Sequence, residues 1–150
     1  MTFKERGAIG DDAERRAEDY FKAKDLFIVR YGLDAKELKG AYESWQYIPS
    51  VVANTPDYIV VAKKKSYFLE VKACGKVLKM KMHDISNYKQ WNRNIFKDMR
   101  LVLFIYSITE DKQYILSLDK LLNLIESNNY SIDRYENNKK PYYIIPLEDL

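Results

Sequence analysis

Apolar positions recur along this chain with two different periods, and the change between them marks the predicted elements. Near the N-terminus they are three to four residues apart, which predicts an amphipathic helix that begins at Asp11 or Asp12 and ends near Ala23. Farther along, β-branched and aromatic residues gather in short runs between polar turns, which is typical of strands. The predicted strands span residues 26–31, 58–62, 67–72, 77–82, 101–106, 113–118 and 142–145.

Further helices are predicted between these strands. One begins at Asp84 or Ser86 and presents an inner apolar face as far as Met99, and a short one follows Asp119 as its cap. Residues 32–55 are irregular, with a short helix at 34–39, and residues 127–140 are expected to form a loop. The last strand is expected at a sheet edge because prolines bracket it. This order of elements predicts an α/β fold, with a mixed central sheet and helices on both of its faces.

Composition restricts the class of protein. The chain has 150 residues, enough for one domain with a core, and 47% of them are hydrophobic, which argues against extensive disorder. Cys74 is the only cysteine and His83 the only histidine, which excludes a disulfide framework and a zinc site of nitrogen and sulfur ligands. No apolar run is as long as a membrane span, and the charged N-terminus does not resemble a signal peptide. We therefore expect a single domain over residues 1–150, cytoplasmic and without a membrane partner.

Positive charge is concentrated in one part of the chain. The net charge is only +3, but residues 72–100 hold eight lysines or arginines against two aspartates. Such a segment is typical of a surface that follows a polyanion, although a solvated lysine face is the alternative. The candidate nucleic-acid-binding residues are Lys76, Lys79, Lys81, Lys89 and Arg93.

Two carboxylates and one ammonium are spaced so that adjacent strands can bring them together. Asp57 follows Pro56 at the start of one predicted strand, and Glu70 and Lys72 lie at the end of the next. Alternation along a strand places Glu70 and Lys72 on the same face, about 7 Å apart. Asp57 can meet Glu70 across the ladder, where opposed Cβ atoms are about 5 Å apart. Carboxylates that close repel each other unless a cation lies between them, and oxygen ligands of this kind suit magnesium or manganese.

This arrangement resembles the PD-(D/E)XK nuclease superfamily, including Holliday-junction resolvases and phage nucleases. The resemblance covers roughly residues 7–106 and implies a restriction-endonuclease-like, three-layer α/β/α fold. The superfamily usually has a further acidic residue on a helix before the first strand. Glu14 is the residue that resembles it here, and Glu18, one turn later, is the alternative.

The resemblance implies a metal-dependent phosphodiesterase. Asp57, Glu70, Glu14 and the backbone carbonyl of Val71 are the expected ligands of Mg²⁺ or Mn²⁺. Lys72 is expected to orient or deprotonate the attacking water, with a lowered pKa because it is desolvated beside a cation. The expected activity is that of a DNA endonuclease, structure-selective or phage-type, and a homodimer suits cleavage of both strands. A non-catalytic nucleic-acid- or protein-binding module and an RNA endonuclease remain the alternatives.

Overall fold

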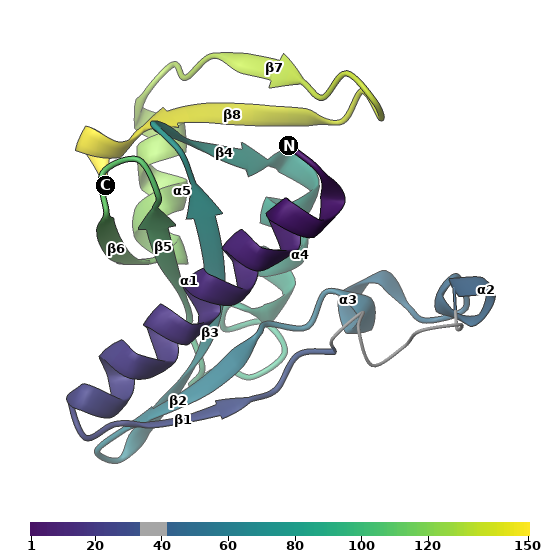
Figure 1. Cartoon of the computed structure of the whole chain (residues 1–150). Helices are drawn as coiled ribbons and strands as arrows, with labels where there is room; N and C mark the ends of the chain where they lie inside the picture. The colour runs from purple at the N-terminus through teal and green to yellow at the C-terminus, as the bar shows by residue number, and fades with distance from the viewer. Residues whose placement is uncertain (34–41) are drawn as a thin grey trace.

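The computed structural model describes residues 1–33 and 42–150 of the chain (Figure 1). Within these residues, five strands form a mixed central sheet in the order β1-β2-β3-β5-β6. β3 and β5 are parallel, and the other neighbours are antiparallel. The strands are β1 (Phe27–Arg30), β2 (Tyr58–Ala62), β3 (Lys65–Cys74), β5 (Leu101–Ser107) and β6 (Lys112–Ser117).

The β2–β3 hairpin is present as predicted, and its turn consists of Lys63 and Lys64. Lys63 has a φ of 58°. Tight hairpin turns require such a backbone, because it matches the twist of the two strands. Lys65, which lies between the predicted strands 58–62 and 67–72, is the first residue of β3 and pairs with Ala62.

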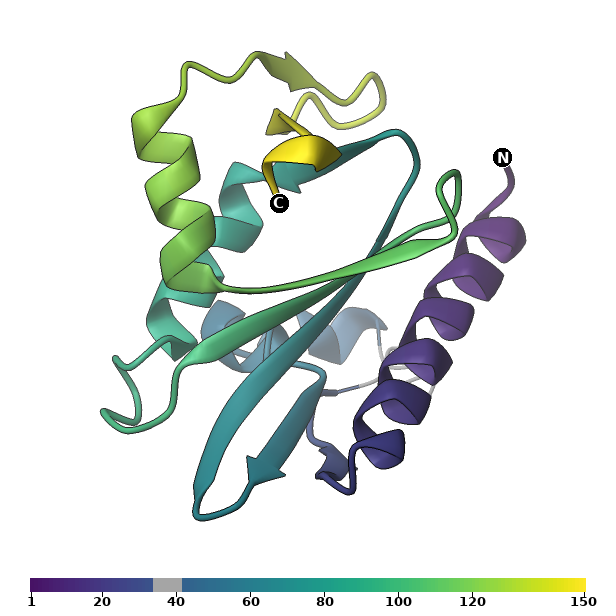
Figure 2. The same ribbon diagram turned by 90° about the vertical axis from the view of Figure 1, so that its left-hand side faces the viewer.

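Helices cover both faces of the central sheet, as Figure 2 shows. α1 (Phe3–Ala23) packs on one face, where its buried Ala13, Ala17 and Phe21 meet side chains of β2, β3 and β5. α4 (Met82–Trp91) and α5 (Leu118–Ser127) pack on the opposite face. The two faces therefore bury separate apolar clusters, as the strand alternation predicted.

α1 begins about two turns earlier than predicted. Thr2 caps it: the Thr2 hydroxyl accepts a hydrogen bond from the Glu5 N–H, and the Glu5 carboxylate accepts one from the Thr2 N–H. This reciprocal pair satisfies N–H groups that a helix start otherwise leaves without partners, so the helix extends to Phe3.

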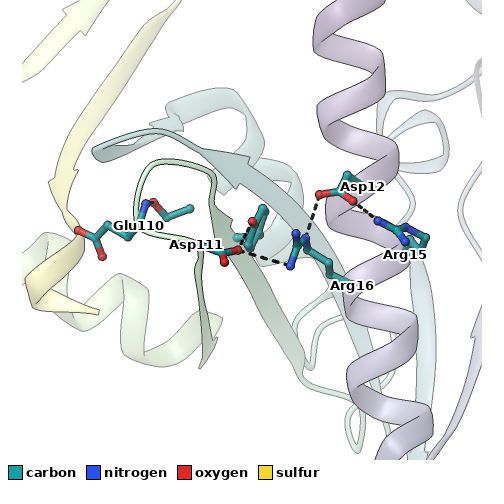
Figure 3. A network of polar contacts seen from close by, with 7 residues as sticks. Asp12, Arg15, Arg16, Glu110 and Asp111 are labelled. Atoms are coloured by element: carbon teal, nitrogen blue, oxygen red, sulfur yellow. Dashed lines mark hydrogen bonds and ion pairs between the residues drawn. The ribbon is translucent and has the colours of Figure 1, made fainter.

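A polar network joins α1 to the turn between β5 and β6 (Figure 3). Arg16 pairs with Asp12 on its own helix, lies 3.6 Å from a carboxylate oxygen of Asp111, and covers the ring of Tyr106. The Tyr106 hydroxyl donates to Asp111 at 2.6 Å, and Arg15 forms a second pair with Asp12. Through Asp12 and Arg16, the network attaches α1 to the turn between β5 and β6.

In the described residues, a second sheet of three strands lies beside the end of the central one, in the order β4-β8-β7 (Figure 1). Its strands are β4 (Val77–Lys81), β7 (Ile132–Arg134) and β8 (Pro141–Pro146). The prediction that the last strand lies at an edge is wrong, because β8 pairs on both sides. Its two prolines are tolerated because they occupy the strand ends. Part of the predicted 127–140 loop forms β7.

Three further predicted helix boundaries are wrong. α4 begins at Met82, with Lys81 as its N-cap residue, rather than at Asp84 or Ser86. α4 ends at Trp91 rather than near Met99, because the Asn92 side chain accepts from the Leu101 N–H and Arg93 has a φ of 60°. α5 begins at Leu118 and is capped by the Ser117 hydroxyl, two residues before the predicted cap Asp119.

Three shorter elements complete the described chain: α2 (Tyr42–Trp45), α3 (Ser50–Ala53) and the 3-10 helix η1 (Leu147–Asp149). The helix predicted at 34–39 lies outside the described residues. No helix in the described ranges has the length and apolar character needed to cross a membrane.

Candidate active site

The hairpin brings Asp57 against β3. The last paired residues of the β2–β3 ladder are Tyr58 and Leu69, so the next step of the register places Asp57 opposite Glu70. The Val71 N–H donates to Asp57 Oδ2 at 2.9 Å. This hydrogen bond holds the Asp57 carboxylate beside the backbone of β3.

Glu70 and Lys72 point toward α4, as their shared face predicted. The Tyr88 hydroxyl donates to Glu70 Oε1 at 3.0 Å. Lys72 Nζ donates to Asp84 Oδ2 at 2.9 Å and lies 3.8 Å from Glu70 Oε1. Its ammonium also lies 5.5 Å from the centre of the Tyr88 ring. The motif is therefore completed by a helix that follows it in the chain.

Asp84 is the residue that sequence reasoning did not assign to the site. Asp84 and Tyr88 are four residues apart on α4, and this spacing places both side chains on one helix face. The spacing indicates that Asp84 and Tyr88 share a helix face. It assigns them to the site only once α4 is seen to pack over β3. Asp84 was considered only as a helix cap.

These groups line a polar recess of about 270 Å³. The lining comes from β3, β4 and α4, from the end of α3 and the segment before β2, and from Leu33 after β1. The lining residues are Leu33, Ala53, Asn54, Thr55, Asp57, Glu70, Lys72, Lys81, Asp84, Asn87 and Tyr88.

The Glu70 carboxyl holds its proton more tightly than an ordinary glutamate. Burial and then the negative charge of Asp57 raise its pKa to about 8, against the smaller effects of Lys72 and the Tyr88 hydrogen bond. Burial, the larger cause, disfavours the ionised form of Glu70, and Asp57 adds to that effect. A cation bound in the recess would stabilise the ionised form of Glu70.

The ammonium of Lys72 is strongly retained. Burial acts to lower its pKa, but Tyr88, Glu70 and Asp84 together raise the pKa well above the ordinary value. The lowered pKa predicted for Lys72 beside a bound cation therefore stays a prediction. It considered desolvation and a neighbouring cation, but not an acidic partner on α4.

Glu14 lies on α1, on the other side of the central sheet. Its carboxylate forms an ion pair with Arg30 at 3.0 Å, and burial raises its pKa, opposed by Arg30 and assisted by Asp57. The alternative, Glu18, accepts a hydrogen bond from the Tyr58 hydroxyl at 2.6 Å. Neither lines the recess. The structure thus brings Asp57, Glu70 and Lys72 together and places the helix acids against other partners.

The candidate basic residues are distributed over several elements. Lys76 lies between β3 and β4, Lys79 and Lys81 on β4, Lys89 on α4, and Arg93 beyond that helix. Lys81 also lines the recess, whereas Lys79 lies over the ring of Tyr142 at 5.2 Å. Arg93 is 3.4 Å from Asp119, so part of its charge is compensated within the protein.

The donor set of the recess fits a hard divalent cation. No group of three or more His, Cys, Asp or Glu side chains in the described ranges is arranged to hold a metal. Asp57 and Glu70 supply two carboxylates, and the Val71 carbonyl points to the same side of β3 as its N–H, toward Asp57. Magnesium commonly binds one or two carboxylates and takes its remaining ligands from water and substrate phosphate.

The fold is shared with two nucleases of known structure. No protein-family model and no curated protein matches the sequence. The structure is similar to Hjc, a Holliday junction resolvase from Archaeoglobus fulgidus, with a TM-score of 0.55 and 11% identity over 93% of this chain and 85% of that chain. It is also similar to D212, a nuclease from a fusselovirus, with a TM-score of 0.53 and 15% identity over 99% of this chain and 86% of that chain. These likenesses confirm the predicted restriction-endonuclease-like α/β fold.

Proposed function

We propose that this chain is a divalent-metal-dependent nuclease that hydrolyses phosphodiester bonds in DNA. One observation carries the proposal. The Asp57 carboxylate accepts a hydrogen bond from the Val71 N–H, and Glu70 and Lys72, the neighbours of Val71, line the same polar recess. A purely structural ion pair does not require the second carboxylate, whose presence raises the pKa of Glu70. The fold shared with a Holliday junction resolvase and a viral nuclease supports the same proposal.

Asp57, Glu70 and the Val71 carbonyl would hold Mg²⁺ or Mn²⁺. The ion, when bound, supplies positive charge to the scissile phosphate and makes water a better nucleophile. Lys72, which donates to Asp84 and lies beside Glu70, would orient or deprotonate the attacking water and offset developing negative charge. Glu14, paired with Arg30, contributes negative charge from the α1 side and is the least supported of the predicted ligands.

DNA rather than RNA is proposed because one of the two similar structures is a Holliday junction resolvase. Endonucleolytic cleavage of both strands of a branched or duplex substrate needs two sites, so we propose a homodimer as the active form. Sedimentation of the protein alone and with a four-way junction tests that assembly.

Cleavage of a labelled substrate panel tests the activity. The panel contains single-stranded DNA, duplex DNA, a four-way junction and RNA, each with Mg²⁺, Mn²⁺ or EDTA. We expect metal-dependent cleavage of DNA that is lost in Lys72→Ala and Asp57→Asn. Lys64→Ala is the matched control, because Lys64 is an exposed lysine in the hairpin turn, at the end of β3 away from the site.

Calorimetric titration with Mg²⁺ gives a readout independent of cleavage. We expect binding by the wild-type protein and weaker binding by Asp57→Asn. If the wild type binds the nucleic acids and never cuts them with either metal, the nuclease proposal fails and the chain is a binding module. Preferential cleavage of RNA would retain the chemistry and overturn the DNA assignment.

A further inference from the structure

Two exposed aromatic rings flank a buried one beside the recess. The ring of Tyr31 stacks on Phe68 at 5.7 Å with an interplanar angle of 23°, and Phe96 approaches Phe68 from 6.1 Å. Phe68 is buried, whereas Tyr31 is 39% exposed and Phe96 is 49% exposed. Trp91 meets both Tyr31 and Phe68 edge-on. We call Tyr31 and Phe96, supported by Phe68, the aromatic shelf.

The backbone fixes the aromatic shelf relative to Asp57. The N–H groups of Tyr31 and Gly32 both donate to the Asp57 carbonyl, at 2.9 and 3.1 Å. Gly32 allows this approach, since a Cβ there would lie 2.8 Å from the Pro56 carbonyl oxygen. The next residue, Leu33, lines the recess itself. The position of Tyr31 is therefore tied to that of the candidate metal ligand.

The strand register places the shelf next to the candidate metal site. Phe68 and Glu70 lie two residues apart on β3, on the same face, so their Cα atoms are about 7 Å apart. The Phe68 N–H donates to the Arg100 carbonyl, which joins the strand to the loop that carries Phe96. A phosphate bound through a metal ion at Glu70 and Asp57 would thus have its neighbouring nucleotide over the shelf.

The charges around the shelf suit a nucleic acid. The loop between α4 and β5 that contains Phe96 also carries the exposed Arg93, Lys97 and Arg100, against Asp98. Exposed rings beside cations match a ligand with planar bases and a phosphate backbone. A base that remains paired inside a duplex keeps its faces stacked on its neighbours, so the shelf can accept only an unpaired base.

We propose that the aromatic shelf stacks an unpaired base next to the phosphodiester held in the recess, and that it directs the protein to single-stranded, flap or junction DNA over uninterrupted duplex. This inference rests on the proposed function and specifies its substrate class. Stacking on aromatic side chains accounts for roughly a 5- to 100-fold gain in affinity per base. We expect about a tenfold loss on removal of either exposed ring.

Fluorescence of 2-aminopurine in DNA oligonucleotides tests the shelf without catalysis, in EDTA. One oligonucleotide is single-stranded, one carries an unpaired flap, and one is a closed duplex. We expect the wild type to quench the unpaired probes and bind them more tightly than duplex. Tyr31→Ala and Phe96→Ala should each lose about tenfold affinity for unpaired DNA only, and Tyr31→Phe should retain it.

Phe27→Ala is the matched control, because Phe27 is an exposed phenylalanine at the other end of β1. Phe96→Leu keeps apolar volume without the ring and covers the case in which an alanine variant unfolds. If all variants bind with equal affinity, or if Tyr31→Ala and Phe96→Ala lose as much affinity for duplex as for unpaired DNA, the shelf proposal is wrong even if the protein cleaves DNA. Quenching that depends on the shelf without any cleavage overturns the nuclease and retains the shelf. Absence of binding to every oligonucleotide overturns the shelf, and the cleavage panel with Mg²⁺ and Mn²⁺ then decides the nuclease separately.

Discussion

The ion pair between Lys72 and Asp84 should be a strong contributor to the stability of the metal-free protein. Replacing Lys72 with methionine leaves the Asp84 carboxylate in the recess without its cation, and replacing Asp84 with asparagine leaves the ammonium with Glu70 alone. Each single variant should therefore be much less stable than the wild type. The double variant should be more stable than the sum of the two losses predicts.

The size of this coupling follows from the geometry. At 2.9 Å the attraction between the two charges is about 6 kcal/mol for an effective dielectric constant near 20. Desolvation offsets part of it, and the side chains of Lys72 and Asp84 retain 26% and 18% of their exposure. Removing one partner of a fully buried pair costs about 3–5 kcal/mol. An exposed pair contributes about 0–1 kcal/mol. We therefore expect a coupling of about 2–3 kcal/mol.

Urea unfolding of the wild type, both single variants and the double variant at pH 7 in EDTA measures this coupling. The pair Lys22–Glu18 is the matched control, because it joins residues four apart on α1 at 3.7 Å, with the two side chains 63% and 38% exposed. Its coupling should be about 0.3–0.5 kcal/mol. A Lys72–Asp84 coupling no larger than that of the control pair would refute the reasoning.

Two further predictions concern residues around the recess. In EDTA, the free energy of unfolding should fall as the pH rises from about 5 to 8. Glu70 has a pKa of about 8 in the folded protein and an ordinary value of 4.5 in the unfolded chain, so over this range the folded state keeps a proton that the unfolded state releases. The slope is at most about 1.4 kcal/mol per pH unit. Urea unfolding at several pH values should show that Glu70→Gln removes it, and an unchanged slope in the variant would contradict the assignment. Gly32→Ala should destabilise the protein by about 1–3 kcal/mol, because its Cβ meets the Pro56 carbonyl oxygen at 2.8 Å, and thermal unfolding checks this against Gly7→Ala, where a Cβ meets nothing within 4 Å.

Strands and their faces were predictable from the sequence because side-chain alternation is a local property. The positions of Tyr58 and Val60 on one face, and of Phe68, Glu70 and Lys72 on the other, follow directly from the period of two. Helix ends were less predictable. The early start of α1 depends on the Thr2–Glu5 capping box, a local signal that the apolar pattern does not contain. The early end of α4 depends on a hydrogen bond that the Asn92 side chain accepts from the N–H of Leu101, nine residues later in the chain.

The sequence by itself determined that Asp57, Glu70 and Lys72 share one end of a hairpin, since pairing and alternation leave little freedom there. Only the tertiary structure decided their electrostatic state. Packing of α4 over β3 places Asp84 and Tyr88 against Lys72 and Glu70, and packing of α1 on the other face gives Glu14 to Arg30. The pKa of a charged group depends on every polar group within a few ångströms. The helices that supply those groups are positioned by burial of their apolar faces, not by the spacing of the motif.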